Sequence, residues 1–304
     1  MHNPLVSISC TTYNHAPYIR KCLDGFLMQQ CDFEFEIVIH DDASTDETQE
    51  IIKEYQKEFP DIIKPIFQTE NQYSKTGSGI MARYNFPRVQ GKYIALCEGD
   101  DYWTDPFKLQ KQVDFMEAHP DYSLISGAYI SKKSVSGEEK SVIFEADKAD
   151  NENEKGFEIT QEDFLKRWLT KTLTLMFRKA AYDSIDFGKY KHLRDVHLYY
   201  SLLDKGNGYY MKEVLGVYNI HPGGIFSEIS EKDKHVSYLN VYGELYQHNK
   251  SDVHLKQKYY GILKRIAAAN YNIKSKKQLY FKMFLMYNKW SDLKSLIKAI
   301  IKNR

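Results

Sequence analysis

The first 130 residues alternate between short apolar runs and amphipathic stretches, and this alternation restricts the fold more than any other feature of the sequence. Apolar runs typical of buried strands occupy residues 5–10, 36–40, 64–68 and 93–97. Apolar residues at helical spacing lie between them, from Tyr18 to Leu27 and from Ile51 to Tyr55. Strands that alternate with helices form mostly parallel sheets covered on both faces. The sequence therefore predicts an α/β fold around such a sheet.

Polar residues follow three of these predicted strands at the point where each strand ends. The first is followed by Thr11-Thr12-Tyr13-Asn14, the second by Asp41-Asp42-Ala43-Ser44 and the fourth by Glu98-Gly99-Asp100-Asp101. Ligands of open α/β sheets bind beyond the carboxyl ends of the strands. We therefore expect these acids and hydroxyls to meet at one edge of the sheet and to form the functional site.

The acidic turn at residues 98–101 is the sharpest chemical signal in the sequence. Carboxylate oxygens clustered on a tight turn suit Mg²⁺ or Mn²⁺ bound together with the phosphates of a substrate, and Gly99 permits a close backbone approach. Taken alone, these residues could form only a solvated turn before the helix that follows Pro106. The Asp41-Asp42 pair at the neighbouring strand end favours the metal site.

Asp42 and Thr11 are candidates for holding a nucleotide base. A carboxylate can accept a hydrogen bond from an imide N–H group, and the end of a neighbouring strand can position it. Alternatively, residues 41–44 form only a turn and a helix cap. The residues by themselves leave both interpretations open.

The rest of the chain divides into a mixed segment and a helical one. We predict a helix over 106–119, a strand over 124–130, an exposed charged stretch over 138–155, a helix capped at Thr160 and an ordered segment over 173–177. From about Lys232 the pattern is helical, and it ends in an apolar stripe of Leu293, Leu296, Ile297, Ile300 and Ile301. We expect a sheet domain over residues 1–228, with a nucleotide-binding part at 1–130 and an acceptor part at 131–228, and a helical region over 229–304.

Composition excludes several classes of protein. The 42 Lys and Arg residues nearly balance the 41 Asp and Glu residues, so no overall field favours nucleic acid as a partner. No stretch approaches the roughly 20 apolar residues that a membrane-spanning helix needs. The four cysteines form no close CxxC pair, which favours a reducing compartment. We expect a cytoplasmic protein.

Three segments, at residues 6–14, 37–46 and 91–101, resemble in order the signature segments of family-2 glycosyltransferases. The resemblance covers roughly residues 4–227. It implies the GT-A fold and a metal-dependent enzyme, with Mn²⁺ or Mg²⁺ as cofactor, that transfers a hexosyl or N-acetylhexosaminyl group. The implied donor is a nucleotide sugar, most often a UDP-sugar.

The resemblance also implies roles for individual residues. Thr11 and Asp42 match the positions that hold the base, and Asp100 matches one that contacts the ribose or the sugar. Asp101 would be the direct metal ligand, with Glu98 and His221 as further candidate ligands. Tyr13 and Asn14, after the first strand, belong to the expected donor-binding set. Arg83 lies between the third and fourth predicted strands, where its side chain could reach the diphosphate or could lie only in a solvated loop.

Asp195, in the segment Leu193-Arg194-Asp195-Val196-His197, best matches the carboxylate that acts as the base in inverting members of this family. An aspartate at the start of a helix is more often an N-cap than a catalyst, so the residue pattern alone does not assign this role. With the resemblance, it implies a single displacement that inverts the anomeric carbon of the sugar.

The implied function is transfer of a sugar to a hydroxyl of a glycan or a lipid-linked acceptor in capsule, O-antigen or other surface-polysaccharide synthesis. A sugar nucleotidyltransferase is the first alternative, although the residues after the first strand include neither glycine nor lysine to hold a triphosphate. A nucleotide-sugar-binding protein without activity is the second. Lysines beside the apolar stripe near the C-terminus favour a helix that packs on its own domain, with peripheral membrane contact as the functional alternative.

Overall fold

The computed structural model describes residues 3–144, 155–224, 229–269, 276–287 and 289–301. The chain divides into two compact units. We call residues 1–189 with 193–227 the sheet unit, and residues 190–192 with 228–304 the helical unit.

The described part of the sheet unit is built on a ten-stranded sheet whose main path runs β3-β2-β1-β4-β9-β6-β10-β5. Its first four neighbours are the parallel strands β3 (Ile63–Phe67), β2 (Phe35–Asp41), β1 (Val6–Thr12) and β4 (Tyr93–Glu98). Strand β9 (Met176–Arg178) runs antiparallel to β4 and to β6 (Tyr122–Lys133). The predicted α/β fold with a mostly parallel sheet is therefore confirmed.

Helices α1 (Ala16–Leu27), α2 (Thr48–Glu58) and α4 (Lys108–Ala118) contribute to one hydrophobic core with β1 and β2. Ile19, Leu23 and Phe26 of α1 recur at helical spacing and are fully buried. They pack in the core with Ile8 of β1 and Ile39 of β2. The apolar periodicity of the sequence thus decides which face of each helix meets the sheet.

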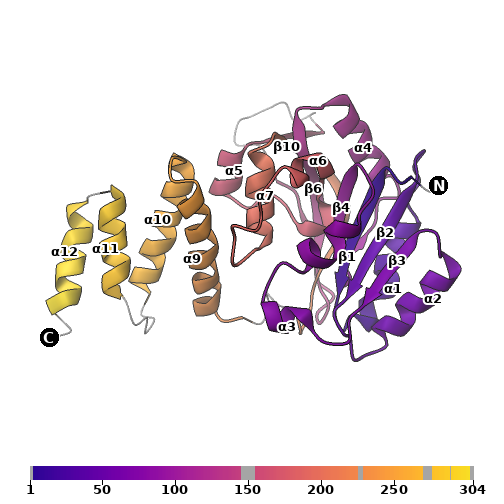
Figure 1. Cartoon of the computed structure of the whole chain (residues 1–304), viewed down its shortest axis with the longest axis horizontal. Coiled ribbons are helices and arrows are strands. Elements are labelled where there is room, and N and C mark those ends of the chain that lie inside the picture. The colour runs from indigo at the N-terminus through magenta and orange to yellow at the C-terminus, as the bar shows by residue number, and fades with distance from the viewer. Residues whose placement is uncertain (1–2, 145–154, 225–228, 270–275, 288, 302–304) are drawn as a thin grey trace. The chain divides into compact units, whose positions relative to one another are not determined.

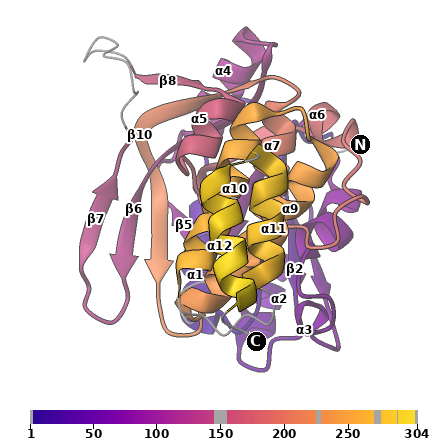
Figure 2. The ribbon, with the colours of Figure 1, turned by 90° about the vertical axis from the view of Figure 1, so that its left-hand side faces the viewer.

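Strand β10 (Asn207–Ile220) is the longest strand of the sheet unit in its described part, and the sequence indicates only its end, as a strand before His221. It runs parallel to β6 and antiparallel to the two-residue strand β5 (Tyr102–Trp103) and to β8 (Gly156–Ile159). Figure 2 shows β6, β7 (Glu139–Val142) and β10 as long neighbouring ribbons. The first part of the predicted charged excursion therefore forms β7, an exposed strand paired with β6, while residues 145–154 lie outside the described residues.

Short helices complete the sheet unit: α3 (Gln72–Thr76), the π-helical turn Met81–Asn85, the 3₁₀ turns Phe86–Arg88 and Thr172–Thr174, α5 (Gln161–Lys166), α6 (Lys179–Asp183) and α7 (Asp195–Leu203). The predicted cap at Thr160 is confirmed, because its hydroxyl accepts the N–H of Asp163, whose carboxylate accepts in return. At α2, the residue before the helix is Glu47, whose side chain makes no cap, while Asp46 accepts the N–H of Thr48.

The helical unit consists, in its described part, of α9 (Glu231–His248), α10 (Val253–Ala268), α11 (Lys276–Tyr287) and α12 (Trp290–Ile301). Figure 1 shows them side by side in chain order. Asp252 caps α10 by accepting the N–H of Leu255. Tyr259, Leu263 and Ile266 of α10 are buried.

A buried lysine lies beneath β5, next to the acidic turn. Lys108, the first residue of α4, is fully buried; its ammonium nitrogen lies 3.9 Å from the centre of the Trp103 ring and donates to Oε1 of Gln112 at 2.7 Å. The indole N–H of Trp103 donates to the carbonyl oxygen of Leu173 at 2.7 Å. Burial lowers the pKa of Lys108 to about 7.

Replacing Lys108 with methionine should change how stability depends on pH. The folded chain binds the lysine proton more weakly than the unfolded chain does. Below about pH 7, burial of the charged ammonium therefore reduces the free energy of unfolding by its full amount, and this loss shrinks as the pH rises toward the pKa of the unfolded chain, near 10.4. Relative to Lys108→Met, the wild type should gain roughly 1 kcal/mol of unfolding free energy per pH unit between about pH 7 and 9. Urea unfolding at each pH measures this difference.

Lys57→Met on the exposed face of α2 is the matched control, and its unfolding curve should stay parallel to that of the wild type. Parallel curves for Lys108→Met as well would show that the Lys108 ammonium is not held in a dry site.

Candidate functional site

The three polar strand ends lie next to one another at one edge of the sheet. Strand β1 pairs on one side with β2 and on the other with β4. In this register Thr11 lies between His40 and Glu98, and Thr12 lies opposite Asp41. Because the strands are parallel, their carboxyl ends point to the same edge.

The acidic turn is fastened to the end of β1. The backbone N–H of Gly99 donates to the carbonyl oxygen of Thr11 at 2.9 Å. A Cβ atom on Gly99 would lie 2.7 Å from the hydroxyl oxygen of Thr12, too close for any other residue without a shift of the turn. The glycine therefore lets Asp100 and Asp101 follow directly behind the end of β1.

Asn219 of β10 holds the two aspartates from the other side. Its backbone N–H donates to Oδ1 of Asp101 at 2.8 Å, and its side-chain amide donates to the carbonyl oxygen of Asp100 at 2.5 Å. The pairing of Tyr102 with Val217 and of Trp103 with Gly216 continues this contact along β5. A strand more than a hundred residues away in sequence thus fixes the acidic turn.

Two histidines gather around Asp100. Oδ2 of Asp100 lies 3.0 Å from Nε2 of His221 and 3.8 Å from Nε2 of His15, which precedes α1. One ligand atom from each of the three residues lies within 4.8 Å of the others. Nδ1 of His15 is buried and has no hydrogen-bond partner among the described residues.

This cluster fits a divalent cation. Burial lowers the pKa of His15, which favours the neutral imidazole that binds metals. A set of one carboxylate and two imidazoles suits a transition-metal ion such as Mn²⁺ better than Mg²⁺, which prefers oxygen ligands. Among the described residues, the predicted ligands Glu98, Asp101 and His221 do not form such a group. His221 belongs to both sets.

Carboxylates crowd the rest of the site. Burial, together with the charge of Asp100, raises the pKa of Glu98 to about 8. Burial followed by the charges of Asp100 and Glu98 raises the pKa of Asp101 well above its usual range. Carboxylates that repel one another in this way would be relieved by a bound cation.

Asp195 is the first residue of α7 and belongs to the same electrostatic site, because its charge contributes to the raised pKa of Glu98. The residue is exposed, yet enough protein surrounds its carboxyl group that burial raises the pKa of that group. The N–H of Val196 and the charge of Lys171 act in the opposite direction. The result is an accessible carboxylate in a recessed position.

Lys171 is a cation that acts on three of these acids. Its ammonium lies 4.0 Å from the centre of the Tyr218 ring, and its charge lowers the pKa values of Glu98, Asp101 and Asp195. Sequence reasoning did not identify this residue or His15. The position of His15 directly after the first polar strand end could have pointed to it, whereas nothing in the local pattern around Lys171 does, since that residue reaches the site through the tertiary fold.

Asp42 receives two backbone hydrogen bonds at the start of α3. Its Oδ1 accepts the N–H of Gln72 at 2.7 Å and its Oδ2 accepts that of Tyr73 at 2.9 Å. Each oxygen retains further lone-pair capacity, so these bonds leave room for one to a ligand. The carboxylate thus anchors α3 at the sheet edge, and its role toward a base stays a prediction.

The remaining predicted donor residues occupy different settings. Tyr13 is 42% exposed just past β1. Asn14 has a left-handed backbone (φ 54°), and its Oδ1 accepts the N–H of Thr45 at 2.7 Å, which ties the ends of β1 and β2 together. Arg83 is exposed and lies beside Gly79 and Leu193. Leu193 comes two residues before Asp195 in the sequence.

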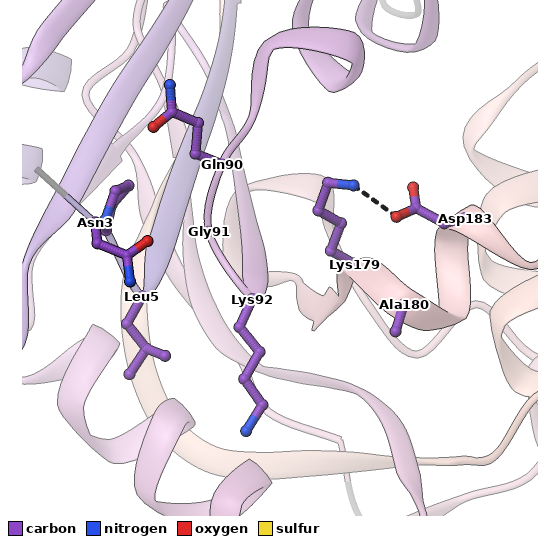
Figure 3. Close-up of a pocket in the computed structure, with 9 residues that line it drawn as sticks. Asn3, Leu5, Gln90, Gly91, Lys92, Lys179, Ala180 and Asp183 are labelled. Atoms are coloured by element: carbon purple, nitrogen blue, oxygen red, sulfur yellow. Dashed lines mark hydrogen bonds and ion pairs between the residues drawn. The ribbon is translucent and has the colours of Figure 1, made fainter. Parts of the chain in front are cut away.

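A depression of about 480 Å³ lies at the opposite ends of β1 and β4 (Figure 3). Its lining includes Gln90, Lys92 and Lys179. Lys179 pairs with Asp183 at 2.5 Å and Lys92 with Glu117 at 2.6 Å. Because its two lysines are paired and its lining offers no metal-ligand cluster, this depression does not compete with the edge that carries the acidic turn.

Known proteins resemble both the sequence and the fold. A "Putative teichuronic acid biosynthesis glycosyltransferase TuaG" of Bacillus subtilis is 28% identical over 225 residues, 74% of this chain and 82% of the relative. The structure of S. aureus TarS 1-349 in complex with UDP matches with a TM-score of 0.60 at 18% identity, over 90% of this chain and 78% of that one. Mannosyltransferase PcManGT from Pyrobaculum calidifontis, in complex with GDP-Man and Mn²⁺, matches with a TM-score of 0.54 at 17% identity, over 99% and 87%.

An uncharacterized protein of Mycobacterium tuberculosis is 45% identical over 118 residues, which are 38% of this chain. The match spans about a third of that relative's length (32%). The family model of Glycosyl transferase family 2 matches residues 7–185, which include β1, β2, β4 and the whole acidic turn. With this match over more than half of its length and a GT-A fold like that of TarS, the chain belongs to glycosyl transferase family 2.

Proposed function

We propose that the protein transfers a sugar from a nucleoside diphosphate, with UDP as the favoured nucleotide, to an acceptor hydroxyl with inversion at the anomeric carbon. The observation that carries this proposal is the geometry of the carboxyl edge of the sheet, where Asn219 holds the acidic turn directly behind the end of β1. A donor bound along that turn would lie between the acids and a recessed carboxylate able to accept a proton.

The donor would lie across the ends of β1, β2 and β4. Thr11 and Asp42 offer a hydroxyl and a carboxylate at adjacent strand ends, suited to the edge of a uracil base. UDP in the TarS structure and GDP-Man in the PcManGT structure support a nucleotide-sugar donor for this fold. Arg83, exposed near Leu193, is the candidate to contact the diphosphate.

A divalent cation would be held by Asp100 and His221 with His15, or by Asp101 with Glu98 and His221. When bound, it would supply positive charge that neutralises the leaving diphosphate. Mn²⁺ in the PcManGT structure supports such a cofactor.

Asp195 is the proposed base of the displacement. Its carboxylate takes the proton of the acceptor hydroxyl while the acceptor oxygen bonds to the anomeric carbon and the bond from that carbon to the diphosphate breaks. Lys171 favours the charged form of Asp195, which keeps the carboxylate able to accept the proton. A base in this position is worth about 10²–10⁴-fold in rate.

The proposed acceptor is a glycan or a lipid-linked saccharide of a cell-surface polysaccharide. Its support is the name of TuaG, which assigns that relative to teichuronic acid biosynthesis. The sequence match to TuaG extends over most of both chains, so it includes more than the nucleotide-binding strands.

A panel of nucleotide sugars with Mn²⁺ tests the activity, read out as release of the nucleoside diphosphate. Asp195→Asn should reduce transfer by about 10²–10⁴-fold and leave donor affinity within a few-fold, because the amide cannot accept the proton. Asp204→Asn, just past the other end of α7, is the matched control and should keep full activity. Unchanged turnover in Asp195→Asn would show that this residue is not the base. Release of pyrophosphate from a nucleoside triphosphate would show that the protein is a nucleotidyltransferase and not a glycosyltransferase.

The two candidate metal sites predict different variant behaviour. If His15, Asp100 and His221 hold the ion, His15→Ala should weaken Mn²⁺ binding by about tenfold or more, since even an outer hydrogen bond to a ligand is worth that much. If Asp101 and Glu98 hold it with His221, Asp101→Asn should weaken binding and His15→Ala should not. Titration of Mn²⁺ by electron paramagnetic resonance, without donor, separates the two. His119→Ala, an exposed imidazole on α4's C-terminal end, is the control.

Asp195 should also reduce stability at neutral pH. Burial raises the pKa of Asp195 in the folded chain above its value in the unfolded chain. The contribution of the protonated carboxyl group to the free energy of unfolding is therefore fully present below about pH 4 and is lost as the pH rises through the folded pKa. Asp195→Asn should therefore melt at a higher temperature than the wild type at pH 8 and at nearly the same temperature at pH 4. Thermal unfolding at both pH values measures the effect, and a lower melting temperature at pH 8 would contradict it.

A further inference from the structure

The near-neutral net charge of the chain hides a strong separation of charge. Residues 228–304 contain 16 Lys and Arg against 6 Asp and Glu, a net charge of +10. Residues 1–227 contain 26 against 35, a net charge of −9. The sheet unit, with its acidic turn, is therefore acidic, and the helical unit is strongly basic. A basic segment of this kind is typical of chains that bind anionic surfaces.

The asymmetry is sharpest in α10, α11 and α12. From residue 253 to the end, 13 Lys and Arg accompany a single acidic side chain, Asp292. Asp292 is only 5% exposed and accepts the hydroxyl hydrogen of Tyr260 at 2.7 Å. In the part of these helices that the structure describes, lysines lie over tyrosine rings: Lys256 is 4.7 Å and Lys289 4.8 Å from the centre of the Tyr287 ring. From residue 253 onward, the sequence thus offers 13 positive side chains and a single carboxylate, which is buried.

Helix α11 is apolar on two opposite faces. Leu279 and Met283 are buried, at 7% and 3% exposure, on the face that packs within the unit. Phe281 and Leu285 lie four residues apart on the opposite face and are 52% and 66% exposed. Trp290, the first residue of α12, is 74% exposed. Two aromatic rings and a leucine therefore lie in water within ten residues of chain, beside exposed Lys289 and Lys294.

Chemistry distinguishes the possible occupants of this surface. Protein interfaces are depleted of lysine at their centres, and phosphates of nucleic acid give no reason to expose Leu285 and Phe281. A bilayer with anionic headgroups uses both properties, because its interface accepts aromatic and leucine side chains while lysines stay among the headgroups. In the described residues, no helix is long and apolar enough to cross a membrane, so contact through these helices would be interfacial.

We propose that α11 and the start of α12 form a docking surface for an anionic lipid bilayer. Phe281, Leu285 and Trp290 enter the interface, and Lys289 and Lys294 contact the headgroups. This proposal is independent of the transfer reaction, because it uses none of the residues of the sheet edge.

Flotation of the full chain with vesicles tests the proposal without donor or acceptor. The chain should float with phosphatidylcholine vesicles that contain phosphatidylglycerol and should float far less with vesicles of phosphatidylcholine alone. High salt, which screens the lysines, should lower the partition coefficient for the anionic vesicles about tenfold or more. The triple variant F281S, L285S and W290S should lose binding by about tenfold or more. Val135→Ser, which removes an 82% exposed valine in the sheet unit, is the matched control and should bind like the wild type.

A second readout covers the case in which the triple variant fails to fold. Trp290→Phe keeps an apolar ring, so binding of this variant to vesicles should persist. Brominated lipid should quench the tryptophan fluorescence of the wild type, and this quenching should be lost in Trp290→Phe. Equal binding to neutral and anionic vesicles, or full binding by a folded triple variant, would overturn the proposal. A third result would also overturn it: the wild type forms an oligomer, measured by light scattering, and does not bind vesicles, while the triple variant is monomeric. The occupant of the surface would then be a second copy of the chain.

Discussion

The two hydrogen bonds from Asn219 to the acidic turn are the interaction on which the candidate site depends. They join β10 to the end of β4, whose neighbour β1 carries Thr11 and Thr12. Without them, the turn would keep the hydrogen bond from Gly99 to Thr11, but Asp101 would lose its contact with β10. With them, Asp100 is held beside His221, only two residues beyond Asn219, and His15. One residue of β10 therefore converts an acidic turn into a defined cluster.

That fixed geometry has an electrostatic cost. Asp101 is almost completely buried among like charges, and the pKa of Glu98 is raised to about 8, so neither carboxylate ionises easily in the isolated chain. Lys171 relieves the repulsion only in part. A site with such repulsion between carboxylates is stabilised most by a ligand that brings positive charge. The crowding therefore favours a bound cation, and the cation in turn allows an anionic donor to bind.

Local pattern predicted much of the fold, because apolar periodicity is a property of neighbouring residues. It identified β1, β2, β3, β4 and the helices α1 and α2, and the roles expected of Asp100 and Asp101 followed from their position after β4. It indicated a strand before His221 but not the length or the pairing of β10, which depend on residues far away in the sequence. It also missed Lys171, which reaches the site through packing over a long separation, and His15, because no short pattern pairs that residue with Asp100. The register of β10 against β6 contains shifts that no short pattern encodes. The chain's net charge of +1 likewise concealed the separation between the two units.

The separation of charge fits the roles proposed for the two units. The carboxylates of the donor site contribute to the net charge of −9 over residues 1–227. An anionic bilayer would repel such a segment, so an enzyme that acts on a lipid-linked acceptor would need a separate source of attraction. Under the proposed membrane contact, the lysines of α10, α11 and α12 would supply that attraction, because the single acidic side chain in these helices, Asp292, is buried against Tyr260.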